Sequence, residues 1–327
     1  MPLPQNAVIG GKYRIGPRVG EGGMGEVYRA VNLQNNRPVA VKALLLEESE
    51  TALARFRQEA VIQYNLRHPN VAELFEYFEF QGRPCIAMEF VEGKTLDACL
   101  RESGALEVDK ALEILADICD AVSFMHSKGT IHRDIKSENI RVTSQGKAKL
   151  LDFGISISKT SPALTKMGYS IGTPEKMAPE QHRGLRGDAR SDVWALGVLL
   201  YEMVSGAAPF TGASVREDIL AVRYVPVARR KPGIPKSVAG IIGMCLKMKP
   251  DERYASAGVM LRDVQRVRRN WQGGSWAEFS VPKPALIAGV LAAVAAVLLI
   301  YAIILSSETK SRVPFAGESR PPGEESR

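Results

Sequence analysis

The chain has 327 residues, of which 45% are hydrophobic and 24% are charged, an ordinary composition for a folded globular protein. Its net charge of +7 fits a partner such as nucleic acid, acidic lipid or a phosphorylated ligand, but the basic residues form no run, which argues against nucleic acid. The four cysteines are widely spaced and form no CxxC pair, so they fit reduced, buried thiols of a cytosolic domain better than a disulfide framework or a zinc site.

The first third of the chain is expected to be rich in strands. Its first sixteen residues contain no long apolar core, so no signal peptide is expected. Residues 8–46 have the pattern of short strands and turns, residues 52–66 that of a helix, and residues 71–91 alternate as strands do.

From about Leu106 the pattern becomes mainly helical. Residues 108–129 carry apolar side chains at helical spacing and end in a glycine, and helical patterns continue to about Arg269. The sequence therefore predicts an α+β protein with a small strand-rich part followed by a larger helical part.

The composition changes near the end of the chain. Residues 285–305 are 21 residues without a charge, roughly 31 Å as a helix, which matches one bilayer core. A buried core helix is the alternative, but such helices rarely stay apolar on every face. The flanking residues favour a transmembrane span: Trp271, Trp276, Phe279, Lys283 and Tyr301. We expect a linker at 271–284 and a disordered tail at 306–327.

The stretch "VGEGGMGEV" begins at Val19 and contains glycines spaced as G-x-G-x-x-G-x-V. A dinucleotide-binding fold uses a similar run between a strand and a helix. Here the following "EVYRAV" is expected to be a strand, and Lys42 comes in a later strand, "VAVK". Backbone N–H groups of glycines can approach phosphates closely and a lysine adds a cation, so the sequence favours a phosphate-binding hairpin. Glu59, in the following helix, is a candidate partner for Lys42, and a solvated helix face is the alternative.

A second polar cluster lies in "GTIHRDIKSENIRV", Gly129 to Val142. Asp134 can accept a proton, Lys136 can meet a phosphoryl oxygen, and Asn139 can offer its carbonyl oxygen to a metal. Asp152 follows in "LLDFGIS", an apolar setting in which a magnesium ion would account for an acid. A solvated loop is the alternative for such a charged segment.

Together these motifs resemble the Hanks-type serine/threonine protein kinases over roughly residues 10–270, and "GEGGMGEVYRA" resembles the bacterial members most. The matching elements appear in order: Gly20/Gly22/Gly25/Val27, Lys42, Glu59, His132-Arg133-Asp134, Asn139, Asp152-Phe153-Gly154, Ala178-Pro179-Glu180, Asp192 and Arg253. The resemblance implies a bilobal protein kinase fold, with a small β-rich N-lobe at about 10–91 and a larger helical C-lobe at about 92–270.

The resemblance also implies the catalytic roles. Lys42, held by Glu59, would contact the α- and β-phosphates of ATP. Asp134 would orient the substrate hydroxyl and take its proton, and Lys136 would stabilise the transferred phosphoryl group. Asn139 and Asp152 would bind Mg²⁺.

In the implied ATP site, Met88 would be the gatekeeper, and the Glu89 carbonyl and Val91 N–H would hold adenine. Val27 and Ala40 would cover the base, with plain core packing as the alternative. The complete implied set is Val19, Gly20, Glu21, Gly22, Gly23, Met24, Gly25, Glu26, Val27, Ala40, Lys42, Met88, Glu89 and Val91.

Regulation is implied by Arg133, which in the family pairs with a phosphate on the activation loop, here residues 152–180. Thr165 is the favoured phosphorylation site, and Thr173 lies eight residues later. Thr173 and Lys136 both resemble the serine/threonine branch of the family.

Three residues depart from the family pattern. Ser137 stands where a proline is usual, which is expected to cost only rigidity. Lys176 stands where a tyrosine is common, so the substrate-side pocket is expected to differ. Arg141 replaces the aliphatic floor under adenine. Its stem is expected to cover the base with the guanidinium outward.

The expected function is therefore an ATP- and Mg²⁺-dependent serine/threonine protein kinase, activated by autophosphorylation of its activation loop. A membrane-anchored pseudokinase or scaffold is the alternative, which the intact motif residues disfavour. A ligand receptor is disfavoured because a 22-residue tail is too short for a sensor domain. The expected location is the inner membrane, with the kinase domain cytoplasmic and the tail outside. Expected partners are protein substrates and the bilayer, a homodimer is allowed, and no nucleic acid is expected.

Overall fold

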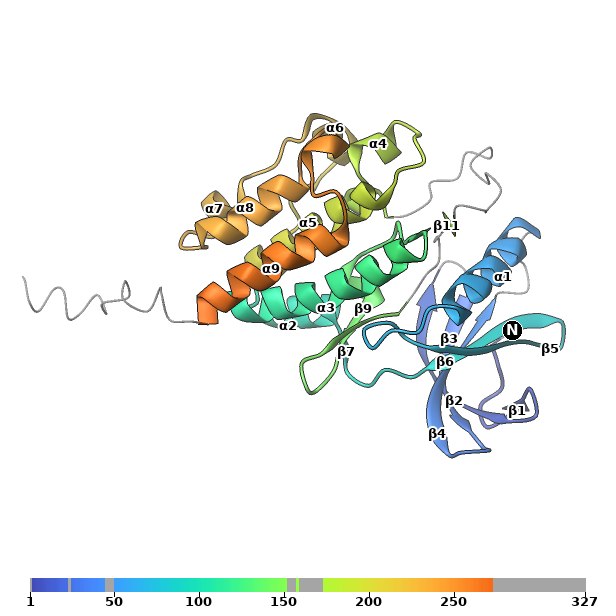
Figure 1. Cartoon of the computed structure of the whole chain (residues 1–327). Helices are drawn as coiled ribbons and strands as arrows, with labels where there is room; N and C mark the ends of the chain where they lie inside the picture. Colours follow the sequence, from blue (N-terminus) through green and yellow to red (C-terminus); the bar gives the residue numbers. More distant parts are fainter. Residues whose placement is uncertain (1, 23–24, 45–49, 152–156, 159–172, 273–327) are drawn as a thin grey trace, which may run out of the picture. The chain divides into compact units, whose positions relative to one another are not determined.

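A computed structural model describes residues 2–22, 25–44, 50–151, 157–158 and 173–272 (Figure 1). Met1–Gln272 form one compact unit. The other unit, Gly273–Arg327, lies outside the described residues, and so do the predicted linker from 273 onward, the span at 285–305 and the tail. No helix among the described residues is long and apolar enough to cross a membrane.

The first part of the chain folds into a six-stranded sheet with the order β1-β2-β3-β4-β6-β5. All neighbouring strands are antiparallel. The strands are β1 (Val8–Ile9), β2 (Tyr13–Gly22), β3 (Gly25–Asn32), β4 (Arg37–Leu44), β5 (Leu74–Phe80) and β6 (Arg83–Glu89). The predicted strands are confirmed, and the glycine motif forms the β2–β3 hairpin, with Gly22 opposite Gly25.

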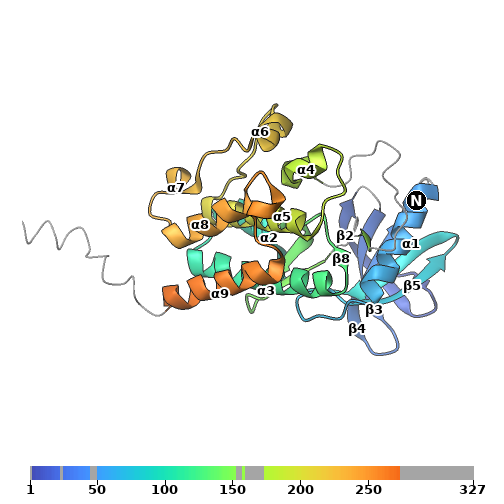
Figure 2. The same ribbon diagram turned by 45° about the horizontal axis from the view of Figure 1, so that its top comes forward.

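Helix α1 (Glu50–Tyr64) confirms the predicted helix at 52–66 and packs on this sheet beside β5 (Figure 2). Its buried Phe56 lies in one apolar cluster with Leu74 and Met88 of the sheet. The sheet and α1 bury their apolar faces against each other, which is the usual reason for a layered lobe.

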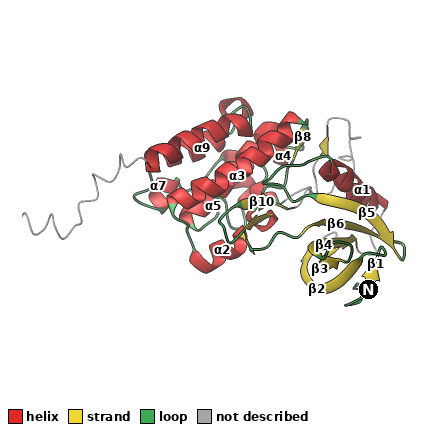
Figure 3. Ribbon diagram, turned by 60° about the horizontal axis from the view of Figure 1, so that its bottom comes forward, coloured by secondary structure: helices red, strands yellow, loops and turns green. Residues whose placement is uncertain are grey.

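The rest of the described chain is mainly helical, as predicted. Figure 3 shows these helices separated from the N-terminal sheet, with α3 and α9 side by side. The α-helices are α2 (Leu96–Ser103), α3 (Val108–Ser127), α4 (Pro179–His182), α5 (Ala189–Ser205), α6 (Val215–Ala221), α7 (Val227–Arg230), α8 (Lys236–Cys245) and α9 (Ala257–Gln272). Single 3₁₀ turns are η1 (Ser137–Asn139), η3 (Pro174–Lys176) and η4 (Pro250–Glu252).

Helix α5 lies in the centre of the C-lobe core, because every residue from Ser191 to Val204 is buried. A helix that is apolar on nearly all faces requires neighbours all round it. The Asp188 side chain caps its start by accepting the Arg190 N–H at 2.8 Å, and Gly206, with a φ of 72°, ends it. Gly197 lets α8 approach closely, since a Cβ there would lie 2.3 Å from the Cβ of Cys245.

Short strands inside the C-lobe were not predicted. β9 (Ile140–Val142) pairs with β10 (Ala148–Leu150) and with β7 (Lys94–Thr95), and β8 (Thr130–Ile131) pairs with β11 (Ile157–Ser158). Two or three residues are too few to show an alternating pattern, so only the tertiary pairing defines these strands. They matter because the β9–β10 hairpin contacts the N-lobe, where Leu150 forms a bridge with Val71 and Lys149 pairs with Glu89.

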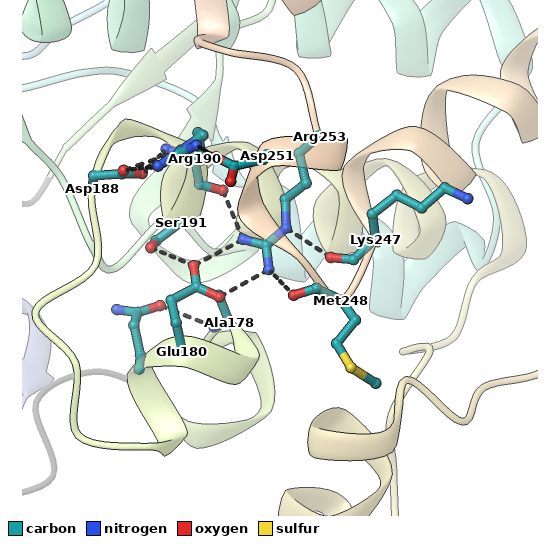
Figure 4. A network of polar contacts seen from close by, with 10 residues as sticks. Ala178, Glu180, Asp188, Arg190, Ser191, Lys247, Met248, Asp251 and Arg253 are labelled. Carbon is teal, nitrogen blue, oxygen red and sulfur yellow. Dashed lines mark hydrogen bonds and ion pairs between the residues drawn. The ribbon is translucent and has the colours of Figure 1, made fainter.

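A buried ion pair joins Glu180, in the first turn of α4, to Arg253, which directly follows η4 (Figure 4). The Arg253 guanidinium donates two hydrogen bonds of 2.8 Å to the Glu180 carboxylate. Its remaining donors go to the backbone carbonyls of Lys247, Met248 and Arg190. Burial alone would raise the pKa of Glu180, but the Arg253 contacts outweigh it and lower the pKa. A buried pair of this kind is tolerated because all its polar atoms have partners.

Candidate active site

The loop between β8 and η1, Ile131 to Lys136, is held by one buried carboxylate. Asp192 on α5 is fully buried and accepts the backbone N–H groups of His132 at 2.9 Å and Arg133 at 2.8 Å. The His126 ring lies 2.8 Å from the same carboxylate. Burial acts to raise the pKa of Asp192, but the His126 contact, the nearby His132 and the Arg133 N–H together lower it. Arg133 has a φ of 69°, an unusual conformation that these contacts stabilise.

Four polar side chains of the predicted site meet just beyond this loop. The Asp134 carboxylate lies 2.9 Å from the Lys136 ammonium and accepts a 3.0 Å hydrogen bond from the Asn139 amide. The Thr173 hydroxyl lies 3.3 Å from the other Asp134 oxygen and accepts a 2.9 Å hydrogen bond from Lys136. Thr173 directly precedes η3 and lies 39 positions along the chain from Asp134. The tertiary fold therefore builds a compact acid–base cluster from two separate segments.

The Asn139 side chain is oriented in a way that fits a metal ligand. Its amide nitrogen donates both to the Asp134 backbone carbonyl at 2.9 Å and to the Asp134 carboxylate at 3.0 Å. The amide oxygen therefore remains as an acceptor, which is the atom a magnesium ion would use. Asp152, the second predicted ligand, lies outside the described residues. In the described part of the chain, no group of three or more His, Cys, Asp or Glu side chains could hold a metal.

Lys42 lies on β4 in the N-lobe, only 7% exposed, with its ammonium 5.9 Å from the centre of the Phe56 ring. Its register partners are Val27 on β3 and Ile86 on β6. Glu59 lies in α1, and its side chain is outside the described part of the structure.

The three apolar residues predicted to enclose adenine belong to one cluster. Ala40 and Met88 are buried there and are direct register partners, and Val27 packs against the cluster. The cluster also includes Phe56 and Ile86. These positions form one apolar surface beside Lys42, which suits a flat base and equally serves as the core of the lobe.

The glycine motif is placed at the tip of the β2–β3 hairpin, with Gly23 and Met24 outside the described residues. Val19 and Glu21 are exposed, and Gly20 is the register partner of Val27. Glu26 was included in the implied ATP-binding set, but its side chain is not available to a nucleotide. Its carboxylate is buried and hydrogen-bonded to Arg83 at 2.7 Å and to Tyr28 at 3.0 Å. Strand alternation places Glu26 and Val27 on opposite faces, so only the backbone of Glu26 remains for a nucleotide.

A model of the protein kinase domain matches residues 13–264. The chain belongs to the protein kinase family. It is 37% identical over 283 residues to serine/threonine-protein kinase PknB of Mycolicibacterium smegmatis. The aligned region covers 82% of this chain and 44% of that protein. It is 36% identical over 272 residues to serine/threonine-protein kinase PknB of Mycobacterium tuberculosis. Here the aligned region covers 78% of this chain and 43% of that protein. The chain thus spans less than half the length of these curated relatives.

The predicted departures from the kinase pattern have distinct structural outcomes. Ser137, in the usual place of proline, donates a 3.2 Å hydrogen bond to Glu138. Lys176, in the usual place of tyrosine, forms an ion pair with Glu202 of α5. Burial raises the pKa of Glu202, although Lys176 acts to lower it. The Lys176 position therefore forms a largely buried ion pair where the resemblance implies an aromatic ring.

Arg141 departs from the expectation in another way. Its guanidinium was expected to point outward, but it is half-buried and donates a 2.9 Å hydrogen bond to the Val91 backbone carbonyl. It also lies 5.8 Å from the centre of the Phe90 ring. The expectation was wrong because an acceptor and an aromatic face lie within reach, and both stabilise a guanidinium away from bulk water.

The predicted regulatory residues divide between the described and undescribed parts of this kinase domain. Arg133 is half-buried, and burial and the charge of Arg186 lower the pKa of its guanidinium, while Asp192 acts in the opposite direction. A second cation nearby makes this a favourable place for an anion. Thr165 lies outside the described residues. Thr173 was predicted as regulatory, and its contact with Asp134 was not foreseen because nothing in the local sequence links the two.

Thr173→Val should lower kcat about fivefold to tenfold, because the hydroxyl that joins Lys136 to Asp134 is lost from a nearly isosteric side chain. The KM for ATP and the melting temperature should remain unchanged. Thr173→Ser, which keeps the hydroxyl, is the matched control and should restore most of kcat. Steady-state kinetics of the full chain would measure this, and a wild-type kcat for Thr173→Val would show that the contact has no part in positioning.

Proposed function

We propose that this chain is an ATP-dependent serine/threonine protein kinase. The observation that carries the proposal is the cluster in which Asp134 contacts Lys136, Asn139 and Thr173. Membership of the protein kinase family and relatives that bear the name serine/threonine-protein kinase support it.

The chemistry proposed for the cluster follows from the side chains present. Asp134 orients the hydroxyl of a serine or threonine of the substrate protein and accepts its proton. The hydroxyl oxygen forms a bond to the γ-phosphorus as the bond from that phosphorus to the bridging oxygen breaks. Lys136 stabilises the negative charge of the group in transfer. Thr173 acts as a positioning residue, since it contacts both side chains.

Mg²⁺ and ATP fit the residues that remain. Asn139 and Asp152 would hold the metal, and Lys42 would hold the phosphates, with the apolar surface of Val27, Ala40 and Met88 against the base. When bound, the metal would neutralise phosphate charge and help to position the phosphates. The rate enhancement proposed for this chain comes from positioning and charge stabilisation.

Asp134→Asn should reduce phosphoryl transfer below about a tenth of wild type, because the substrate hydroxyl loses its proton acceptor; a tenfold loss corresponds to ~1.4 kcal/mol. Lys42→Met should have a similar effect through misplaced phosphates. Transfer of radiolabel from ATP by the full chain, with and without Mg²⁺, is the measurement.

The control for this assay is Asp120→Asn, which changes an exposed aspartate that lies 3.4 Å from the His68 ring. It should retain wild-type transfer. If Asp134→Asn retained more than a tenth of the activity, the role of Asp134 would be wrong. A wild-type chain that binds ATP without any transfer would instead favour the alternative function, a pseudokinase that acts as a scaffold.

Activation by phosphorylation of residues 152–180 belongs to the same proposal. Arg133 supports it, since a half-buried guanidinium beside a second cation favours an anion. A phosphate adds about −1.5 to −2 charges and would order the segment against Arg133.

We expect Thr165 to be the main site of autophosphorylation. Mass spectrometry of the active full chain after incubation with ATP should place phosphate between Ser156 and Ser170, and Thr165→Ala should remove most of it. The Asp134→Asn variant, treated in the same way, is the control that should carry none. An active preparation without phosphate in this segment would contradict the proposal.

Membrane anchoring is the last element of the proposal. Its support is the uncharged stretch at 285–305 and the need of a kinase domain for ATP and Mg²⁺, which are abundant in the cytoplasm. Basic residues favour the same orientation by a small margin, with Arg266, Arg268, Arg269 and Lys283 before the stretch and Lys310, Arg312 and Arg320 after it. Substrate proteins with serine or threonine acceptors, the bilayer and a second copy of the chain are the proposed partners.

A protease added to intact spheroplasts should remove only the tail after residue 305 and leave the kinase domain whole. The reason is that a single span at 285–305 would leave only the tail outside. Immunoblots against both ends of the chain would measure this, with lysed spheroplasts as the control in which both parts are digested. Digestion of the kinase domain in intact spheroplasts would show that the orientation is the opposite one. Release of the protein from the membrane by carbonate would contradict the transmembrane span.

A further inference from the structure

The segment Glu89–Val91, called the hinge segment below, begins at the last residue of β6 and leads out of the N-lobe sheet (Figure 3). If the proposed function holds, it is the part of the chain that meets adenine. Two basic side chains from the β9–β10 hairpin of the C-lobe contact this segment. They are Arg141 and Lys149, which are direct register partners in that hairpin.

Placing two cations directly opposite each other in an antiparallel pair is normally destabilising. The cost is offset when each cation has its own partner. Here Lys149 contacts both oxygens of the Glu89 carboxylate, at 2.6 and 2.8 Å, and Arg141 donates to the Val91 carbonyl at 2.9 Å. Glu89 and Val91 are the first and last residues of the hinge segment, so Lys149 and Arg141 each contact one end of it.

The Glu89 contact is supported from the N-lobe as well. The Glu89 backbone N–H donates to the Glu73 carbonyl at 2.8 Å, and the Glu73 N–H donates to the Glu89 carboxylate at 3.3 Å. Lys149 therefore binds a carboxylate whose position is already restricted. The Lys149 and Glu89 side chains are 22% and 30% exposed, so the pair is only partly screened by water.

The middle of the hinge segment is contacted from both lobes. The Arg141 guanidinium lies 5.8 Å from the centre of the Phe90 ring, and the guanidinium of Arg29, on β3, lies 5.1 Å from it. Arg29 also lies 3.7 Å from Glu92, just beyond the segment. Burial lowers the pKa of Arg141, but an arginine remains charged in proteins. Its hydrogen bond to Val91 is therefore charge-assisted, and such bonds are stronger than neutral ones.

We propose that Arg141 and Lys149 are positioning residues that fix the hinge segment and thereby set the affinity of this protein for the base of its nucleotide. Contacts within the chain that fix the segment reduce the entropy cost of ordering it when the base binds. This inference deepens the proposed kinase function, because it names residues that act on the base and not on the transferred phosphate.

Adenosine is the probe that separates this role from a general effect of charge. Adenosine is neutral, so loss of a distant positive charge should not weaken its binding, whereas loss of a fixed hinge should. Calorimetric titration of the full chain should give an about fivefold to tenfold weaker Kd for adenosine with Arg141→Met, and the same factor for Mg·ATP. The kcat should stay within about twofold of wild type, and Arg141→Lys should recover part of the affinity.

A double-mutant cycle tests the second contact. Lys149→Met and Glu89→Gln should each weaken adenosine binding, and the double variant should be no weaker than the worse single one, because both changes remove the same ion pair. Lys147→Met is the matched control. It removes one positive charge from the same hairpin, but Lys147 is 60% exposed and pairs with Glu113 and Asp117 of α3.

Each outcome decides the inference. It is overturned if Arg141→Met binds adenosine as tightly as wild type or more tightly, if the Lys149 and Glu89 effects simply add, or if Lys147→Met weakens binding equally. Melting temperatures of all variants show whether a loss comes from unfolding. If the wild type binds adenosine and the variants weaken it but no transfer occurs, the inference stands and the proposed function fails. If the wild type transfers phosphate and Arg141→Met leaves the Kd for adenosine unchanged, the proposed function stands and the inference fails.

Discussion

The carboxylate of Asp192 is the group on which the geometry of the active-site loop depends. It is fully buried on α5 and accepts two consecutive backbone N–H groups, those of His132 and Arg133, while His126 of α3 lies on the same carboxylate. Without these bonds a buried charge would be costly, and without the charge the loop would have two unpaired N–H groups. The loop that carries Asp134 is thus attached directly to the most deeply packed helix of the C-lobe.

A second buried pair has a similar function for the segment that carries Thr173. Arg253 and Glu180 join the start of α4 to η4, and Arg253 also lies 5.0 Å from the Trp194 ring on α5. Thr173 precedes α4 by only a few residues, so its position relative to Asp134 depends on this anchor. The two sides of the acid–base cluster are therefore each anchored to α5 by a buried charge, as Figure 4 shows for the second.

The N-lobe contributes through backbone order and apolar surface. Lys42, Val27 and Met88 come from neighbouring strands, and the antiparallel register alone brings them together. The buried contact between Glu26 and Arg83 lies on the other face of the same strand, so it holds the base of the glycine hairpin from behind. On the C-lobe side, Arg141 and Lys149 contact the chain that links the lobes. The site combines a C-lobe loop held by the Asp192 carboxylate with strands of the N-lobe sheet that are held by ion pairs.

By itself the sequence determined the family, the order of the motifs and the type of each long element. The helical spacing of apolar residues in 108–129 and their alternation in 71–91 predict a helix and strands, because hydrophobic periodicity is a local signal that repeats along the segment. Asp134, Lys136 and Asn139 were also identifiable, since six consecutive positions contain all three.

Only the tertiary structure decided which distant residues meet. Thr173 reaches Asp134 across 39 positions, His126 reaches Asp192 across 66, and Arg253 reaches Glu180 across 73. Arg141 turned towards Val91 because that carbonyl lies within its reach, 50 positions away in the chain. The strands β7 to β11 likewise exist only through their pairing. The physical reason is the same in each case: a polar side chain takes the partner that packing places beside it, and packing depends on the whole fold, not on the residues next to it in sequence.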